Sequence, residues 1–276
     1  MNALGDGQPT AAPAEEFAVA CVDGSVLAIE HASVPVTDEG LLRGDGVFEV
    51  IRLYGGHPFA LDEHMARMTR SAANLRLPFS PSDVEADAAA LLAAAAPGDA
   101  LLRLVATRGG HRIALLEPLP PMPPSISLGC VTYSPTRVLD DIKSLSYAAN
   151  MLAGRLARER GFDEALLVTP HGRVLEAPTA SLFWVSEGDV LTPPLSEHIL
   201  QSITRTRVIE VSEAREEATT REGLDQAHEV FLASTVREVM PVHRVEGHEV
   251  PAPGPVTTRV AAALAQRIHD ELGLPA

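Results

Sequence analysis

The sequence predicts an α+β fold divided into two halves. Pairs of short apolar runs on either side of a turn residue such as glycine recur along the chain, as in β-hairpins. Longer segments between these pairs carry apolar residues at every third or fourth position, as one face of a helix does. Residues 117–124, EPLPPMPP, contain five prolines and can form neither a helix nor a central strand. This segment therefore separates two mixed halves of helices and strands.

We expect four parts along the chain. Residues 1–16 form a flexible tail, and residues 17–118 form a smaller α+β domain. Residues 119–126 are a proline-rich interdomain linker, and residues 127–276 form a larger α+β domain. Both halves are long enough for a core, because 46% of the 276 residues are hydrophobic.

Each element of the first half has a local signal. Asp-Gly and Gly-Gly pairs mark the turns of two hairpins, in residues 17–30 and 46–61. Apolar residues at helical spacing predict a helix from residue 62 to about 77, and the alanine-rich residues 84–96 predict a second helix. The apolar run at residues 100–108, ALLRLVATR, predicts a strand.

The second half begins with a strand at residues 125–133. A helix should follow at residues 144–160, with one face formed by Leu145, Ala148, Leu152 and Leu156. The remaining elements are two hairpins and then two helices, at residues 164–176, 181–193, 203–217 and 256–272.

Composition restricts the function. The formal net charge is −15 and the pI about 5.0, so the surface should repel phosphate backbones and anionic membranes. We therefore expect no nucleic-acid or membrane partner, and no apolar run approaches the ~20 residues of a membrane helix. Cys21 and Cys130 lie in neither CxxC nor metal-like spacing, which favours a reduced, cytoplasmic location and predicts no metal site.

Lys143 is the single lysine among 22 lysine and arginine residues. Arginine can replace lysine in most surface roles, but it cannot form a Schiff base, which requires a neutral primary amine. Lys143 lies between the apolar Ile142 and a helix expected from Ser144, where burial and the helix terminus would both lower its pKa. A chance surface lysine is the alternative, and the neighbouring residues distinguish the two.

Three nearby features fit a bound aromatic cofactor. Tyr147, one helical turn after the lysine, could contact a ring, and Glu176 at a strand end could face a pyridine nitrogen. Ser202 precedes a helix whose first backbone N–H groups, at Ile203 and Thr204, could bind an anion. Each feature also has an ordinary explanation: packing of the tyrosine, solvation of the glutamate and capping by the serine.

Several sequence blocks occur in the order seen in class IV aminotransferases, and the chain resembles this family from about residue 20 to 265. The blocks are GDGVFEVIR, EHMARMTRSA, IKSLSYAANM, VLEAPTASLFWV, LTPPL followed by ILQSITR, and FLASTVREVMPV. Members of the family are pyridoxal-phosphate enzymes of fold type IV. The resemblance implies a two-domain fold type IV architecture with the active site at the domain interface, a homodimer, and pyridoxal 5'-phosphate as the cofactor.

The resemblance also implies roles for individual residues. Lys143 would carry the cofactor and act as the catalytic residue. The other cofactor-binding positions would be Glu176 at the pyridine nitrogen, Tyr147 near the phenolic oxygen, and Arg67, Ile203, Thr204 and Thr235 at the phosphate. Two positions depart from the family pattern, because Ser181 stands where asparagine is usual and Ser202 where glycine is usual. Neither departure removes a group that the reaction requires.

The implied reaction moves an amino group between an amino acid and a 2-oxo acid. GDGVFEVIRLYGG resembles D-amino-acid aminotransferases, with Phe48 where those enzymes have tyrosine, and this favours a D-amino acid slightly. The loop TRGGHRI offers Arg108, His111 and Arg112 as ligands for the substrate carboxylate.

Other activities of the same scaffold remain as alternatives. Arg103 matches a carboxylate-binding arginine of branched-chain L-amino-acid aminotransferases, although Leu101 replaces their tyrosine. A 4-amino-4-deoxychorismate lyase is a further alternative within the family. A non-catalytic binding protein that kept the scaffold should have lost the lysine or the carboxylate, and this chain has both Lys143 and Glu176.

Overall fold

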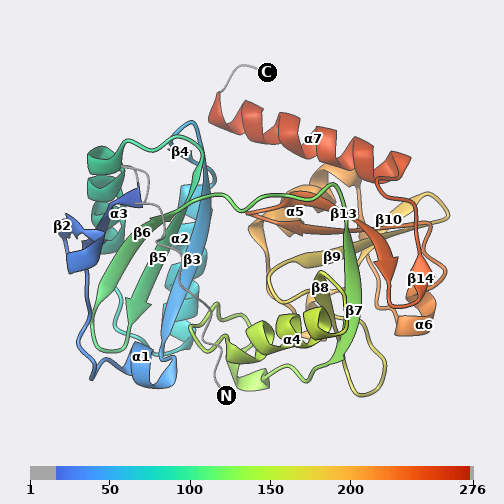
Figure 1. The fold of residues 1–276 in the computed structure, drawn as a ribbon, viewed down its shortest axis with the longest axis horizontal. Helices are drawn as coiled ribbons and strands as arrows, with labels where there is room; N and C mark the ends of the chain where they lie inside the picture. Colours follow the sequence, from blue (N-terminus) through green and yellow to red (C-terminus); the bar gives the residue numbers. More distant parts are fainter. Residues whose placement is uncertain (1–16, 274–276) are drawn as a thin grey trace, which may run out of the picture.

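Two β-sheets, each flanked by helices, make up the computed structural model, which describes residues 17–273 (Figure 1). The tail that we expected at residues 1–16 lies outside the described residues. The arrangement confirms the predicted α+β class. No helix within the described range is long and apolar enough to cross a membrane.

The first sheet is antiparallel, with its six strands in the order β2-β1-β6-β5-β3-β4. The strands are β1 (Val19–Val22), β2 (Ser25–Ala28), β3 (Gly46–Tyr54), β4 (His57–Pro58), β5 (Ala100–Thr107) and β6 (Arg112–Glu117). A short helix, α1 (Glu39–Arg43), precedes β3, and α2 (Leu61–Asn74) and α3 (Pro81–Ala95) pack on the sheet. The helical spacing expected for α2 is confirmed, because Met65, Met68 and Ala72 all enter the core of this half.

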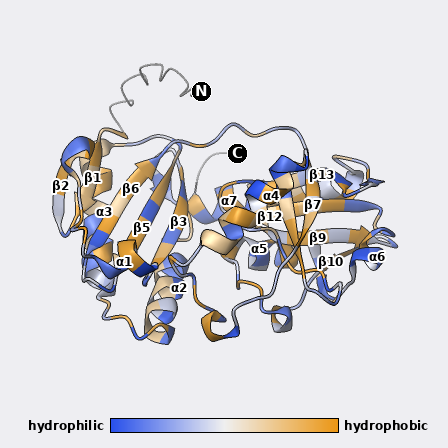
Figure 2. Cartoon of the chain, turned by 60° about the horizontal axis from the view of Figure 1, so that its bottom comes forward, coloured by the Kyte–Doolittle hydropathy of each residue, from blue (hydrophilic) through white to orange (hydrophobic). Residues whose placement is uncertain are grey.

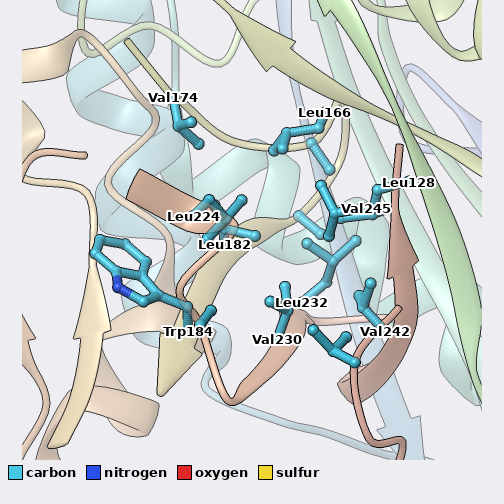
Figure 3. Close-up of a cluster of buried hydrophobic side chains, with 14 of the residues drawn as sticks. Leu128, Leu166, Val174, Leu182, Trp184, Leu224, Val230, Leu232, Val242 and Val245 are labelled. Atoms are coloured by element: carbon cyan, nitrogen blue, oxygen red, sulfur yellow. The ribbon is translucent and has the colours of Figure 1, made fainter. Parts of the chain in front are cut away.

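The second sheet has eight strands and is mixed. Its order is β11-β10-β9-β12-β13-β7-β8, with β14 paired to β13. The strands are β7 (Ile126–Thr132), β8 (Glu164–Val168), β9 (Ser181–Ser186), β10 (Asp189–Thr192), β11 (Arg215–Glu216), β12 (Glu229–Ser234), β13 (Glu238–Val245) and β14 (His248–Glu249). Apolar side chains from six of these strands meet in one core, together with Val174 and with Leu224 of the short helix α6 (Arg221–Leu224) (Figure 3).

Three longer helices cover this sheet. Helix α4 (Ala148–Glu159) packs on β7 and β8, while α5 (Ile203–Ser212) and α7 (Pro255–Leu272) pack together against β12 and β13 (Figure 1). Hydrophobic residues run along most of β7, β9 and β12, whereas hydrophilic bands interrupt β3 and β5 (Figure 2). The charged side chains of β3 and β5 therefore lie outside the hydrophobic core of the first half and are available for other contacts.

The helix expected at residues 144–160 begins later and buries a different face. Ser144 pairs with Val47 of β3, and the Leu145 N–H donates to the Gly46 carbonyl at 2.9 Å. Strand pairing therefore holds residues 143–145 extended, and α4 starts only at Ala148. The buried face is Ala153, Gly154 and Ala157, while Leu152 and Leu156 are 48% and 40% exposed. The predicted apolar face was wrong because small residues, not leucines, allow the helix to approach β8.

Other boundaries also differ from the sequence prediction. The helix expected at residues 203–217 ends at Ser212, because Glu213 adopts a left-handed conformation with φ 54° and the chain then enters β11. In the hairpin expected at residues 164–176, only the first limb is a full strand. The return limb still pairs with it, because the Leu175 N–H donates to the Leu167 carbonyl and the Leu167 N–H to the Glu176 carbonyl, both at 2.9 Å. Strands β6, β12 and β13 were not predicted.

Candidate active site

A cavity of about 310 Å³ lies between the two sheets. One wall comes from α2, β3 and β5 of the first half, and the opposite wall comes from residues 176–181, 200–202 and 234–237 of the second half. Lys143, Tyr147 before α4, Met151 of α4 and Pro120 of the proline-rich segment complete the lining. This volume suits a small-molecule ligand.

Lys143 is half-buried in the cavity wall and held through its backbone. Its N–H donates to Ser71 Oγ at 3.1 Å, and its carbonyl accepts from the Phe48 N–H at 3.2 Å. Its Nζ lies 4.4 Å from the centre of the Phe48 ring and 5.8 Å from that of Tyr147. Burial lowers the pKa of the amine to about 8, even though Glu49 opposes the shift. A substantial fraction of the amine is therefore neutral near physiological pH.

Glu49, Arg67 and His64 form a buried charged group beside Lys143. Arg67 donates from Nε and Nη2 to both oxygens of Glu49, at 2.7 and 2.6 Å, and His64 Nδ1 lies 2.8 Å from Glu49 Oε2. Burial would raise the pKa of Glu49, but the hydrogen bonds and charge of Arg67 outweigh it and hold that pKa at about 2. Burial also lowers the pKa of His64. Glu49 therefore fixes the Arg67 guanidinium, whose Nη1 reaches the Gln201 carbonyl at 3.2 Å.

Glu176 and Tyr147 occupy the part of the cavity next to Lys143. Burial raises the pKa of Glu176 to about 7, although its Oε1 accepts from the Leu200 N–H at 3.1 Å. The Tyr147 hydroxyl donates to the Pro178 carbonyl at 2.6 Å, and burial raises the pKa of this phenol. The ring meets Phe48 edge to face, with centroids 5.4 Å apart. Both side chains are thus fixed before any ligand binds.

The start of α5 provides an anion site at the other end of the cavity. Ser202 Oγ accepts from the Arg205 N–H at 3.2 Å, and the first N–H groups of a helix have no acceptor one turn earlier. The N–H groups of Ile203 and Thr204 therefore remain for an anion, although their side chains are buried and do not line the cavity. Thr235 also lines the cavity. Arg67 donates both to Glu49 and to the Gln201 carbonyl just before α5, so it connects the Glu49 group with this end of the cavity.

The residues expected to bind substrate fall into two groups. Phe48 and Arg103 line the cavity, and Arg103 donates from Nε and Nη2 to the Glu117 carboxylate at 2.7 and 2.9 Å. Arg108, His111 and Arg112 do not line it.

Each of these three side chains instead pairs with an acidic residue outside the cavity. Arg108 Nε lies 2.7 Å from Asp45 Oδ2, and His111 Nδ1 lies 2.8 Å from Asp23 Oδ2. Arg112 Nε lies 2.8 Å from Asp87 Oδ2. The structure thus brings Arg103, and not this loop, to the cavity of the described chain, and a carboxylate-binding role for the loop stays a prediction.

Comparisons with known proteins identify the family. The family model described as amino-transferase class IV matches residues 46–245. A D-alanine aminotransferase of Bacillus licheniformis is 32% identical over 274 residues, which cover 90% of this chain and 96% of the relative. A putative branched-chain-amino-acid aminotransferase of Methanocaldococcus jannaschii is 34% identical over 254 residues, covering 83% and 88%.

Solved structures give the same result. The branched-chain aminotransferase of Thermoproteus uzoniensis, with norvaline, superimposes with a TM-score of 0.85 at 28% identity, covering 92% of this chain and 95% of the other. The branched-chain amino acid aminotransferase of Escherichia coli gives 0.84 at 27% identity, with the same coverage. The chain belongs to the amino-transferase class IV family, and its fold is that of the fold type IV enzymes. It is an aminotransferase.

The cavity residues fit pyridoxal 5'-phosphate, the cofactor of class IV aminotransferases. Ser181 Oγ is buried in the cavity wall without a hydrogen-bond partner among the described residues, at the position where asparagine is usual. Together with the N–H groups at the start of α5 and the guanidinium of Arg67, it would supply the hydrogen-bond donors that a phosphate requires. Lys143 and Glu176 supply the amine and the carboxylate that the aldehyde and the ring nitrogen require.

Sequence reasoning missed several residues of the site. Glu49 had a visible signal, because it is a charged residue within the apolar strand GVFEVIRLY. Arg237 lies within the block FLASTVREVMPV but had no assigned role. Asn150, which donates to the Pro178 carbonyl at 3.1 Å beside Tyr147, had no signal beyond its place three residues after Tyr147.

Proposed function

We propose that this pyridoxal-phosphate-dependent aminotransferase moves the amino group of a free amino acid, with a preference for D-amino acids, to a 2-oxo acid. The observation that carries the reaction is the position of Lys143, the only lysine, which lines a cavity with Glu176 and lies next to Glu49 and Arg67. The D-preference is supported by the similarity to D-alanine aminotransferases over 90% of the chain.

The residues of the cavity divide the work of the reaction. When bound, pyridoxal phosphate supplies the electron sink for the carbanion formed at the substrate α-carbon. Lys143, neutral in part near pH 8, would accept the proton from that carbon and pass it to the cofactor carbon that carried the aldehyde. Glu176 holds a proton at the ring nitrogen, and Arg67 with the start of α5 holds the phosphate. Arg103 orients the substrate carboxylate.

A branched-chain L-amino acid is the second candidate substrate. Arg103 matches the carboxylate-binding arginine of those enzymes and lies in the cavity, whereas the loop that favours D-amino acids lies outside it. The two candidates are separated by mixing the holoenzyme with single amino acids and following the loss of its visible absorption band. A faster half-reaction with D-alanine than with L-leucine supports the first candidate, and the reverse order supports the second.

We also infer a homodimer in the cytoplasm, with residues 17–118 and 127–276 as two domains joined by the linker 119–126. Exposed apolar residues on one face of α4 support self-association: Met151, Leu152 and Leu156. Both cysteines are free, as expected in a reducing compartment.

A further inference from the structure

Two helices carry the ligands proposed for the cofactor phosphate, and they belong to different halves of the chain. Arg67 lies on α2 of the first half, and the N–H groups of Ile203 and Thr204 begin α5 of the second half. Arg67 Nη1 reaches the Gln201 carbonyl, just before α5, at 3.2 Å. The geometry of the phosphate site therefore depends on how these two helices are held relative to each other.

Arg207 joins the same two helices about one turn away from these ligands. It lies on α5 three residues after Thr204, and its partner Glu63 lies on α2 four residues before Arg67. Arg207 donates from Nη1 and Nη2 to the two oxygens of Glu63, at 3.0 and 2.6 Å. Its guanidinium is buried, with Cζ 4.8 Å from the centre of the Phe59 ring. A bidentate pair fixes the orientation of its partners as well as their distance.

Glu271 of α7 is a second carboxylate on the same guanidinium. Its Oε2 accepts from Arg207 Nε at 3.1 Å and from Nη2 at 2.7 Å. Helix α7 packs on α5, but none of its described residues lines the cavity. The two carboxylates thus share one cation and differ in one respect, because only Glu63 lies on a helix that carries a proposed phosphate ligand.

We propose that Arg207 and Glu63 are positioning residues for the cofactor phosphate. Their pair holds α2 and α5 in the register that brings Arg67 to the start of α5. Arg207 does not line the cavity, so it acts through the helices and not by contact with the cofactor. The inference rests on the proposed phosphate site and is independent of which amino acid is the substrate.

The exposure of Glu63 separates this role from a general contribution to stability. Its side chain is 52% exposed, and an ion pair with one partner in solvent adds little to the free energy of unfolding. Glu63→Gln should therefore fold, with Arg207 still neutralised by Glu271. Replacing Arg207 itself would leave two carboxylates close together without a cation, so Glu63→Gln is the better test.

The test titrates apoenzymes of the full chain with pyridoxal 5'-phosphate and with pyridoxal, which lacks the phosphate. The variants are Glu63→Gln, the matched control Glu271→Gln and the reference Arg67→Gln, which removes a proposed phosphate ligand. Thermal melts of each apoenzyme are recorded in parallel. Because both glutamates pair with Arg207, a purely structural cluster predicts similar effects of the first two variants.

We expect Glu63→Gln to raise the Kd for pyridoxal phosphate about tenfold and to change the Kd for pyridoxal by less than about threefold. Glu271→Gln should change both values by less than about threefold, even where its melt shows the larger loss of stability. Arg67→Gln should raise the Kd for pyridoxal phosphate by more than Glu63→Gln does, because it removes a ligand and not only its support.

Four results would overturn the inference. Equal changes in Glu63→Gln and Glu271→Gln would make the cluster structural, and an equal loss of affinity for pyridoxal would separate the pair from the phosphate. An effect of Arg67→Gln without one of Glu63→Gln would refute the inference and keep the phosphate site. If neither variant changes the Kd for pyridoxal phosphate, the phosphate site of the proposed function fails and this inference fails with it.

Discussion

Lys143 is the residue on which the chemistry depends, and arginine is its most informative replacement. Arginine keeps the positive charge that Glu49 and Glu176 face, so we expect Lys143→Arg to fold as the wild type does. It cannot form the covalent link to the cofactor aldehyde, so turnover should be abolished. The measurement is transamination beside a thermal melt. Retained transamination would refute the assignment, and borohydride treatment of the wild-type holoenzyme should label a single lysine-containing peptide.

The lowered pKa of Lys143 has a kinetic consequence. Only the neutral amine attacks an aldehyde, and below a pKa of about 8 its fraction rises about tenfold for each pH unit. The rate at which apoenzyme combines with pyridoxal phosphate should therefore rise with pH and level off above about pH 8. Stopped-flow absorbance measures this profile. A rate that keeps rising to pH 10 would show that the amine titrates like an exposed lysine.

Glu49 should hold the Arg67 guanidinium in place and raise the pKa of the Lys143 amine. Glu49→Gln keeps the shape but removes the carboxylate that fixes the guanidinium, so the Kd for pyridoxal phosphate should rise about tenfold. It also removes the carboxylate that favours the charged amine, so the pH at which reconstitution levels off should fall. A loss of stability without that pH shift would give Glu49 a structural role only. Asp189→Asn, an exposed carboxylate outside the cavity, is the matched control.

Among the elements, those with a local signal were predictable and those set by distant pairing were not. The Asp-Gly pair predicts the turn between β1 and β2, and apolar residues at every third or fourth position predict α2. The turn between β12 and β13 contains neither glycine nor proline. The positive φ that such a turn requires is adopted by Glu238, at 53°, and a glutamate gives no turn signal in the sequence. The segment before α4 could form a helix alone, but pairing with β3 extends it. Local sequence does not contain that partner, nearly a hundred residues away.

The loop after β5 gives a prediction at the scale of an element. Arg108, His111 and Arg112 pair with acidic residues outside the cavity of their own chain, so they can reach substrate only from a partner subunit. If they do, alanine at the responsible position should raise KM for amino acids roughly thirtyfold while sparing 1-phenylethylamine, which has no carboxylate. Steady-state kinetics of the three alanine variants decide this. Equal small changes with both substrates would leave Arg103 as the carboxylate ligand.

For the whole molecule, the cavity could be predicted only through resemblance. Its two walls come from strands, helices and loops on either side of the proline-rich segment, and no local pattern predicts that Arg67 and Glu176 line the same cavity. Resemblance supplied Lys143, Arg67 and Glu176, which line one cavity. It did not supply Arg237, because that residue has no role in the family pattern.

The last prediction concerns association of two chains through α4. Met151, Leu152 and Leu156 are 37%, 48% and 40% exposed on this helix, because its small residues face the sheet instead. If this face is the dimer contact, Leu152→Glu with Leu156→Glu should weaken association at least about a thousandfold, since four leucines leave the interface and four carboxylates enter it. Sedimentation equilibrium should then give the mass of one chain, 29.3 kDa, for the double variant and twice that value for the wild type. Leu27→Glu, on the edge strand β2 of the other sheet, is the control and should stay dimeric. A double variant that sediments like the wild type would place the contact elsewhere, and the loop after β5 would then be the next surface to mutate.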